Sequence, residues 1–166
     1  MPVIKSKLYL ETSIWNFLFV EDAPDKRKST ELLFQRISND KHELYISDTV
    51  IAEIEAASKS KKKQLLSAIE HYRPVQLASD KQVVELADIY LEAGVLSVTH
   101  YNDLLHLAFA TTHDLNLLLS WNLKHLVKHK TRIMVSSILK FRTSKALRKC
   151  VDKHSLSHQE RRRNLL

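Results

Sequence analysis

The sequence predicts one α/β domain built on a parallel sheet with helices on its faces. Short runs of strand-forming residues alternate with longer runs of helical periodicity, which is the chain order that a parallel sheet requires. The 166 residues suffice for one domain with a hydrophobic core, and 44% of them are apolar. Gly94 is the only glycine, which disfavours tight hairpin turns and leaves α/β and all-α chains open. The alternation then favours the α/β class, without an internal repeat or a dividing linker.

Short apolar segments bounded by turn residues predict the strands. KLYL is rich in strand-forming side chains and stops at a carboxylate, Glu11, while LYIS stops at Asp48. The predicted strands are residues 7–10, 44–47, 74–78 and 115–122. A further segment, RIMVSSIL at 132–139, fits either a fifth strand or a helix.

Apolar spacing and capping residues predict the helices between these strands. Asp25, Asp48 or Thr49, and Asp80 are the candidate N-caps, and Gly94 stands where a helix C-cap favours glycine. The expected apolar stripes are Leu32, Leu33, Phe34 and Ile37 in one helix, and Leu65, Leu66 and Ile69 in another. The predicted helices are residues 12–19, 25–37, 50–58, 59–72, 81–94, 99–113 and 123–129.

The chain carries a net charge of +7, with an isoelectric point near 9.5. Much of the excess lies in KSKKK, residues 59–63, and in the tail between residues 140 and 163. A basic surface suits an anionic partner, most commonly nucleic acid, although KSKKK also fits an ordinary solvated helix face. The single glycine excludes a Walker A loop and a GxGxxG motif, and with them the nucleotide-binding classes that use these loops.

The cysteine count and the N-terminus predict the compartment. Cys150 is the only cysteine, so no internal disulfide can form and a reducing environment is expected. The first apolar stretch contains Glu11 and Asn16 and has no small-residue cleavage site. No run of about 20 apolar residues is present. We therefore expect a cytoplasmic protein without a membrane span.

Four polar residues fall at the predicted carboxyl edge of the sheet. Glu11 follows the first strand, Glu53 lies one turn into the helix after the second, and Asn122 follows the fourth. Asp103 lies near the start of the helix before the fourth strand. Ligands of open parallel sheets bind at this edge, and gathered carboxylates need a cation to be stable. Hard oxygen ligands suit Mg²⁺ or Mn²⁺, and a pair of such ions serves phosphodiester cleavage by an activated water. The set predicts a metal-dependent nuclease.

Each of these residues also has an interpretation that requires no ligand. Glu11 fits a solvated strand end, and Glu53 fits an exposed helix residue paired with lysine. Asp103 complements a helix dipole, and Asn122 fits a helix N-cap. The combined spacing, rather than any one residue, therefore carries the nuclease prediction.

Four segments together resemble a PIN domain, and they read LYLETS, ISDTVIAEI, YNDLLHLAFA and LLLSWNLKHL. More narrowly, they are similar to the VapC-type toxin ribonucleases of type II toxin–antitoxin pairs. The similarity covers roughly residues 7–130, and an acid followed by LLHLAFA is its most specific part.

The resemblance implies that Glu11, Glu53, Asp103 and Asn122 are the catalytic and metal-binding residues. Glu11 stands where aspartate is more usual in the family, and the two hydroxyls after it fit those that support the metal. Asn122 is an amide where the family has a fourth acid. It can still ligate through its oxygen but brings no charge, so occupancy by one or by two ions stays open.

The resemblance also implies a fold, an activity and partners. The fold is a three-layer α/β/α sandwich of Rossmann-like or flavodoxin-like type, with a parallel sheet of four or five strands. The activity is Mg²⁺- or Mn²⁺-dependent endoribonuclease cleavage of RNA, and the partners are a second copy in a homodimer and, for a toxin, a cognate antitoxin protein. The alternative is a catalytically degenerate PIN domain that binds RNA or a peptide, which Asn122 and the tail support. A deoxyribonuclease is disfavoured because the chain is short.

The resemblance divides the chain into a PIN-like nuclease domain, residues 1–139, and a divergent basic tail, residues 140–166. The tail contains no glycine or proline and has little apolar periodicity. It does not match the usual ending of the family, and we interpret it as a divergent or frameshifted terminus.

Other patterns are weaker. His125 and His129 have i,i+4 spacing but lack an HExxH motif, so a zinc site is disfavoured. His106 is favoured as a packed or hydrogen-bonded core residue over a ligand. Cys150 has no visible partner for thiol catalysis. Aromatic residues near the first carboxylate are expected in core or dimer contacts rather than in base stacking, namely Trp15, Phe17 and Phe19.

Overall fold

The computed structural model describes residues 5–40 and 42–122, together with positions 126, 131, 134, 135 and 137. It divides into two compact units, Met1–Lys128 and His129–Leu166, and the fold given below is that of the first unit. The predicted tail, most of the helix at 123–129 and most of the segment 132–139 lie outside the described residues, as do His125, His129 and Cys150. Met134, Val135 and Ser137 are helical, which favours the helix at 132–139 over a fifth strand. The domain boundary at residue 139 stays a prediction.

Four parallel strands form the sheet, in the spatial order β3-β2-β1-β4. They are β1 (Lys7–Leu10), β2 (Glu43–Ser47), β3 (Val75–Leu77) and β4 (Leu117–Leu119). Tyr9 on β1 is paired with Tyr45 on β2 and with Leu118 on β4. The last three residues of β1 are buried whichever face they point to, as expected for a central strand of a parallel sheet covered on both sides.

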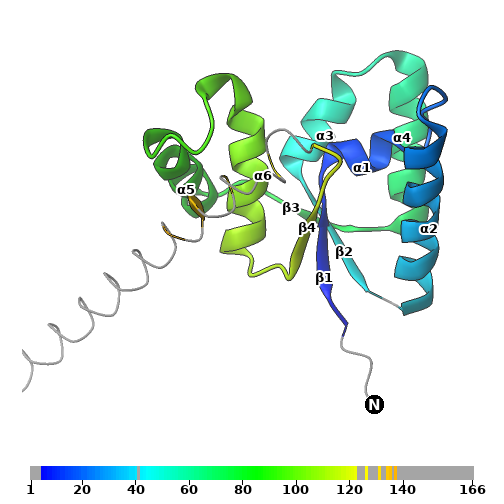
Figure 1. Cartoon of the computed structure of the whole chain (residues 1–166), viewed down its shortest axis with the longest axis horizontal. Helices are drawn as coiled ribbons and strands as arrows, with labels where there is room; N and C mark the ends of the chain where they lie inside the picture. Colours follow the sequence, from blue (N-terminus) through cyan, green and yellow to red (C-terminus); the bar gives the residue numbers. More distant parts are fainter. Residues whose placement is uncertain are drawn as a thin grey trace, which may run out of the picture. The chain divides into compact units, whose positions relative to one another are not determined.

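Helices cover both faces of this sheet (Figure 1). They are α1 (Thr12–Asn16), α2 (Pro24–Asp40), α3 (Asp48–Glu55), α4 (Lys59–Tyr72), α5 (Lys81–Glu92) and α6 (Tyr101–Thr112), with a 3₁₀ turn at Val98–His100. The chain crosses from β1 to β2 to β3 in one direction and then returns past them to β4. Right-handed crossovers therefore place α1 to α4 on one face and α5 and α6 on the other, giving the predicted α/β/α sandwich. Among the described residues, none of the helices has the length and apolar character needed to cross a membrane.

Several predicted helix ends shift in the structure. The first helix ends at Asn16 rather than near residue 19. The cap of α3 is Ser47, whose hydroxyl accepts from the Val50 amide at 3.4 Å, so the prediction of Asp48 or Thr49 was wrong. Asp48 instead accepts two hydrogen bonds from Ser79, at 2.7 and 2.8 Å. Its carboxylate thus anchors the loop after β3 rather than its own helix.

The start of α2 also differs from the prediction. It begins at Pro24, so Asp25 lies in the first turn and is not the cap. Proline suits this first helical position because its missing N–H would be unsatisfied there in any case. On the apolar face of α2, Phe34 and Ile37 are buried as predicted, whereas Leu32 is 50% exposed.

The ends of α5 follow the prediction. The Asp80 carboxylate accepts a hydrogen bond from the Val83 amide at 2.9 Å, which is an N-cap. Gly94 follows the helix with a φ of +70°, a conformation that favours glycine.

The aromatic residues after β1 pack within the unit. Trp15 is fully buried, and its ring lies 5.3 Å from that of Phe34, which confirms it as a core residue. Phe17 is half-buried against Trp121, with the ring centroids 5.6 Å apart. The Lys26 ammonium lies over both of these rings, 4.9 Å from Phe17 and 5.6 Å from Trp121. These contacts tie α1 to α2 and to the segment that follows β4.

Candidate active site

Glu11 occupies the point where β1 and β4 end side by side. Its amide donates to the Leu119 carbonyl at 3.2 Å, and the residue is only 7% exposed. The Oε2 atom accepts from the hydroxyl of Ser13 and, at 2.8 Å, from that of Ser120. Ser13 Oγ in turn accepts from the Trp121 amide at 2.8 Å. Two hydroxyls from neighbouring strand ends therefore fix the orientation of this carboxylate.

Glu53 approaches the same place from α3. Its Oε2 accepts from the Thr12 hydroxyl, and its Oε1 accepts from the Asn102 amide nitrogen at 3.0 Å. The Nε2 atom of His106 lies 3.4 Å from Oε2, at ion-pair distance. Burial raises the pKa of Glu53, but the ion-pair contact with His106 and the hydrogen bonds from Thr12 and Asn102 outweigh it and leave the pKa below its ordinary value. Glu53 is therefore held as a carboxylate.

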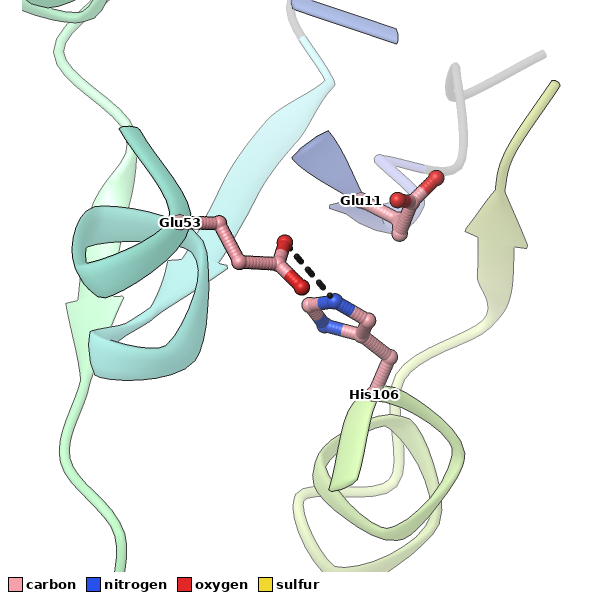
Figure 2. Close-up of side chains that lie close together, drawn as sticks. All are labelled: Glu11, Glu53 and His106. Atoms are coloured by element: carbon pink, nitrogen blue, oxygen red, sulfur yellow. Dashed lines mark ion pairs between the residues drawn. The ribbon is translucent and has the colours of Figure 1, made fainter. Parts of the chain in front are cut away.

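His106 is a buried histidine that also faces the carboxylates. It is fully buried on α6, and its Nδ1 lies 2.7 Å from the Tyr9 hydroxyl, which lies 2.7 Å from the Ser47 hydroxyl. Its Nε2 has no hydrogen-bond partner among the described residues and points toward Glu53 (Figure 2). The prediction of a hydrogen-bonded core histidine is confirmed. The second ring nitrogen faces Glu53 at ion-pair distance.

Tyr9 holds this histidine in place as a neutral phenol. Burial raises the pKa of Tyr9 far above its ordinary value, against the opposing effect of Ser47, and the nearby charges of Glu11 and Glu53 raise it further. A protonated hydroxyl both donates and accepts, so it can bridge Ser47 and His106 at once. The tyrosine thus links the centre of β1 to the start of α3 and to α6.

Together these side chains form a possible metal site. Glu11, Glu53 and His106 each offer one ligand atom, and the three atoms lie within 4.8 Å of one another (Figure 2). Two carboxylates this close repel each other unless a cation or hydrogen bonds offset the charge. Two oxygen ligands and an imidazole nitrogen, all held by hydrogen bonds to neighbouring groups, suit a divalent cation. The residues present therefore fit a metal ion.

Asp103 and Asn122 form a second pair at the same edge of the sheet. The Asn122 amide nitrogen donates to Asp103 Oδ1 at 3.0 Å, and His100 Nδ1 lies 3.5 Å from Oδ2. The Asn122 backbone amide donates to Ser120 Oγ at 2.8 Å, and Ser120 in turn donates to Glu11. The four predicted residues thus form two pairs, Glu11 with Glu53 and Asp103 with Asn122. Ser120 connects the pairs through its hydrogen bonds with Glu11 and Asn122. Their roles as ligands and catalytic groups stay predictions.

Sequence reasoning did not identify Ser120 and Asn102 and placed His106 in the core. Ser120 follows β4 directly, so the rule that selected Glu11 and Asn122 also selects it. His106 lies three residues after Asp103 on α6, which puts both on one helix face. For Asn102 no comparable signal exists, because its contact with Glu53 depends on how α3 and α6 pack.

A cavity of about 300 Å³ opens beside the two glutamates. It gives the carboxylates access to solvent from the side where α1, α3 and α4 meet. Its lining residues are Glu11, Thr12, Ser13, Asn16, Glu53, Ala57, Lys61 and Leu65.

A three-layer parallel α/β fold with carboxylates gathered beyond the strand ends defines a class of proteins suited to metal-dependent chemistry. The family model of the PIN domain matches residues 8–127, and the chain belongs to the PIN domain family. The PIN domain is a nuclease fold that is generally metal-dependent, which accords with the acidic cluster. A search of curated proteins finds no match to the chain.

Proposed function

We propose that the chain is an endoribonuclease that uses Mg²⁺ or Mn²⁺ to cleave RNA phosphodiester bonds. The observation that carries the proposal is the convergence of Glu11 and Glu53, with His106, at the strand ends of a PIN domain. Hard carboxylate oxygens suit these two ions better than softer metals. The net charge of +7 suits a polyanionic substrate.

Glu11 and Glu53 are the residues that would hold the ion, with the Asp103–Asn122 pair beside them. When bound, the ion would supply positive charge that polarises a phosphoryl oxygen and acidifies a water. Both hydroxyl contacts of Glu11 fall on Oε2, which leaves Oε1 for the ion or for a proton. His106 adds a ring nitrogen that lies 3.4 Å from Glu53 Oε2.

The chain's own groups would orient the water and receive its proton. Carboxylates within hydrogen-bond reach of an attacking water serve as general bases, and such catalysis contributes about 10²–10⁴-fold. The hydroxyls of Thr12, Ser13 and Ser120 keep the carboxylate oxygens from rotating. Fixed oxygens need no reorganisation during the reaction, which is how a site of this kind lowers a barrier.

The substitution Asp103→Asn tests the proposal. We expect the variant to lose at least about 10²-fold in the rate of Mg²⁺- or Mn²⁺-dependent cleavage, because it removes a carboxylate from the site. The assay compares single-stranded RNA and DNA of matched sequence, with Asp22→Asn, an exposed site outside the helices, as control. A variant that cuts as fast as the parent would show that the site assignment is wrong.

A second candidate function is a catalytically degenerate PIN domain that binds RNA or a peptide. The Asn122 amide favours it, because this side chain is uncharged and donates to Asp103 instead of adding a carboxylate. The two candidates differ in one observable. A binding module retains full-length RNA when Mg²⁺ or Mn²⁺ is added, whereas the endoribonuclease releases shorter products.

We further propose that the protein is the toxin of a type II toxin–antitoxin pair, a cytoplasmic homodimer inhibited by its antitoxin. The similarity of LYLETS and YNDLLHLAFA to VapC-type toxins supports this. Expression of the chain in a bacterial host is expected to arrest growth, and Asp103→Asn is expected to relieve the arrest. A small upstream gene for a DNA-binding protein would supply the antitoxin, and its co-expression should restore growth.

A further inference from the structure

Among the described residues, the wall of the active-site cavity carries one cation. Lys61, from the first turn of α4, is the only lysine or arginine among the described residues that line the cavity. The helix that carries Glu53 and the helix that carries Lys61 pack against each other and against α1. The lysine therefore belongs to the same packed set of elements as the carboxylates.

Lys61 forms no ion pair or hydrogen bond with the part of the chain that the structure describes. Its neighbour Lys62 pairs with Glu55, whereas Lys61 makes no ion pair with any described residue. Lys61 also makes no ion pair with Glu11 or Glu53. The positive charge is thus near the glutamates without neutralising them.

The first turn of α4 has a sequence that is unfavourable for a helix N-terminus. Lys59, Lys61 and Lys62 fall in its first turn, which contains no acidic residue, and the N-cap Ser58 makes no side-chain capping bond. Cations at a helix N-terminus oppose the helix dipole. Departures of this kind from local preference are expected at functional sites, and an anion bound there would benefit from both the lysines and the dipole.

The cavity wall also holds an unsatisfied acceptor. Asn16 lines the cavity, and its Oδ1 atom is buried without a hydrogen-bond partner among the described residues. Buried polar atoms almost always have a partner. Among the described residues nothing supplies the donor that this acceptor needs, and a ribose hydroxyl of a nucleic-acid strand is a group that can supply it.

We propose that Lys61 holds a backbone phosphate of the substrate, one that flanks the bond to be cut. This inference rests on the proposed nuclease function. It means that α4 helps to position the RNA substrate beside the carboxylates. The scissile phosphate itself belongs next to Glu11 and Glu53, from which the lysine is set apart. A flanking phosphate in the same cavity would neutralise the lysine charge without displacing the scissile phosphate from the carboxylates.

Equilibrium binding tests this assignment without requiring cleavage. A fluorescein-labelled single-stranded RNA is titrated with the full chain in EDTA at several salt concentrations, and anisotropy gives Kd. Each phosphate contact on a single strand contributes about 0.7 to the slope of log K against log salt. Lys61→Ala should therefore flatten the slope by about 0.7 and raise Kd about fivefold at 0.1 M salt.

Two lysines provide matched controls. Lys63 lies on the same helix but lines a different groove, and Lys81 lies on α5, where its side chain is 88% exposed. Lys63→Ala and Lys81→Ala are expected to change Kd less than twofold, about the size of a non-specific charge effect, while Lys61→Arg retains the parent slope. The assignment would be overturned if all three alanine variants lost the same affinity or if Lys61→Ala left the salt slope unchanged. It would also be overturned if the parent showed no measurable binding.

Cleavage kinetics separate this inference from the proposed function. A residue that binds a flanking phosphate contributes equally to the ground state and the transition state, so Lys61→Ala should raise KM and leave kcat within about twofold. A fall in kcat at constant KM would overturn the flanking position. If the parent cuts no RNA with Mg²⁺ or Mn²⁺, the proposed function fails, yet the binding slopes still decide the role of Lys61.

Discussion

Glu53 is the side chain at which burial and charge compete most directly. Burial alone would raise its pKa and favour the neutral acid, but His106, Thr12 and Asn102 stabilise the charged form more strongly. A carboxylate whose pKa is lower in the folded chain than in the unfolded one stabilises the fold at neutral pH. Its unfolded pKa is about 4.3, so this contribution is complete above that value and is lost as the pH falls through the lower, folded pKa.

The substitution Glu53→Gln should therefore change how stability depends on pH. The parent is expected to lose stability below about pH 4.3 more steeply than the variant, because only the parent must protonate Glu53. Urea unfolding followed by circular dichroism between neutral and acid pH provides the comparison. Parallel pH profiles for the two proteins would contradict the lowered pKa.

The Tyr9 hydroxyl leads to a second prediction for a single residue. Tyr9→Phe removes the group that bridges Ser47 and His106, and it leaves two buried polar atoms without that partner. We expect the free energy of unfolding to fall by about 1–3 kcal/mol. Tyr45→Phe is the control, since that hydroxyl donates at the surface to Glu43 on its own strand. If both variants lost the same free energy of unfolding, the buried hydroxyl bridge would contribute no more to stability than a surface hydrogen bond.

Among the elements, α5 depends on a cap that the sequence predicted correctly. Asp80 accepts from the Val83 amide, and α5 packs against α6, which carries Asp103 and His106. Asp80→Ala should lower the free energy of unfolding by about 1 kcal/mol. The melting temperature should then fall by about 2–4 °C, as measured by circular dichroism. Asp22→Ala, at an exposed residue outside the helices, is expected to have no effect, and an equal fall there would refute the capping role.

Element positions were predictable where one local signal acted alone. The strand that stops before Glu11 and the helix between Asp80 and Gly94 follow from short-range patterns. The cap of α3 was not predictable with certainty, because Ser47, Asp48 and Thr49 are three consecutive capping residues. Tertiary contacts decide among them, since Asp48 is bound by Ser79 from beyond the next strand.

At the scale of the whole molecule, the alternation of strands and helices predicts which residues meet. Glu11 and Asn122 are far apart in sequence but follow adjacent strands of a parallel sheet, and the structure joins them through Ser120. Side-chain direction is not contained in that pattern. His106 faces Glu53 and Asp103 is hydrogen-bonded to Asn122 because of the orientation of α6 about its own axis against the sheet. The sequence therefore predicted that Glu11, Glu53 and Asp103 lie at the carboxyl ends of the strands. It did not predict the hydrogen-bond network among them.

Calorimetric titration with Mn²⁺ most directly tests whether this edge is a metal site. We expect the parent to bind Mn²⁺ saturably in or below the low millimolar range, and Glu53→Gln to bind about tenfold more weakly or worse. Glu55→Gln is the matched control, because this exposed residue lies two positions further along α3 and pairs with Lys62 outside the site. No binding by the parent, or equal binding by Glu53→Gln and the parent, would contradict the account.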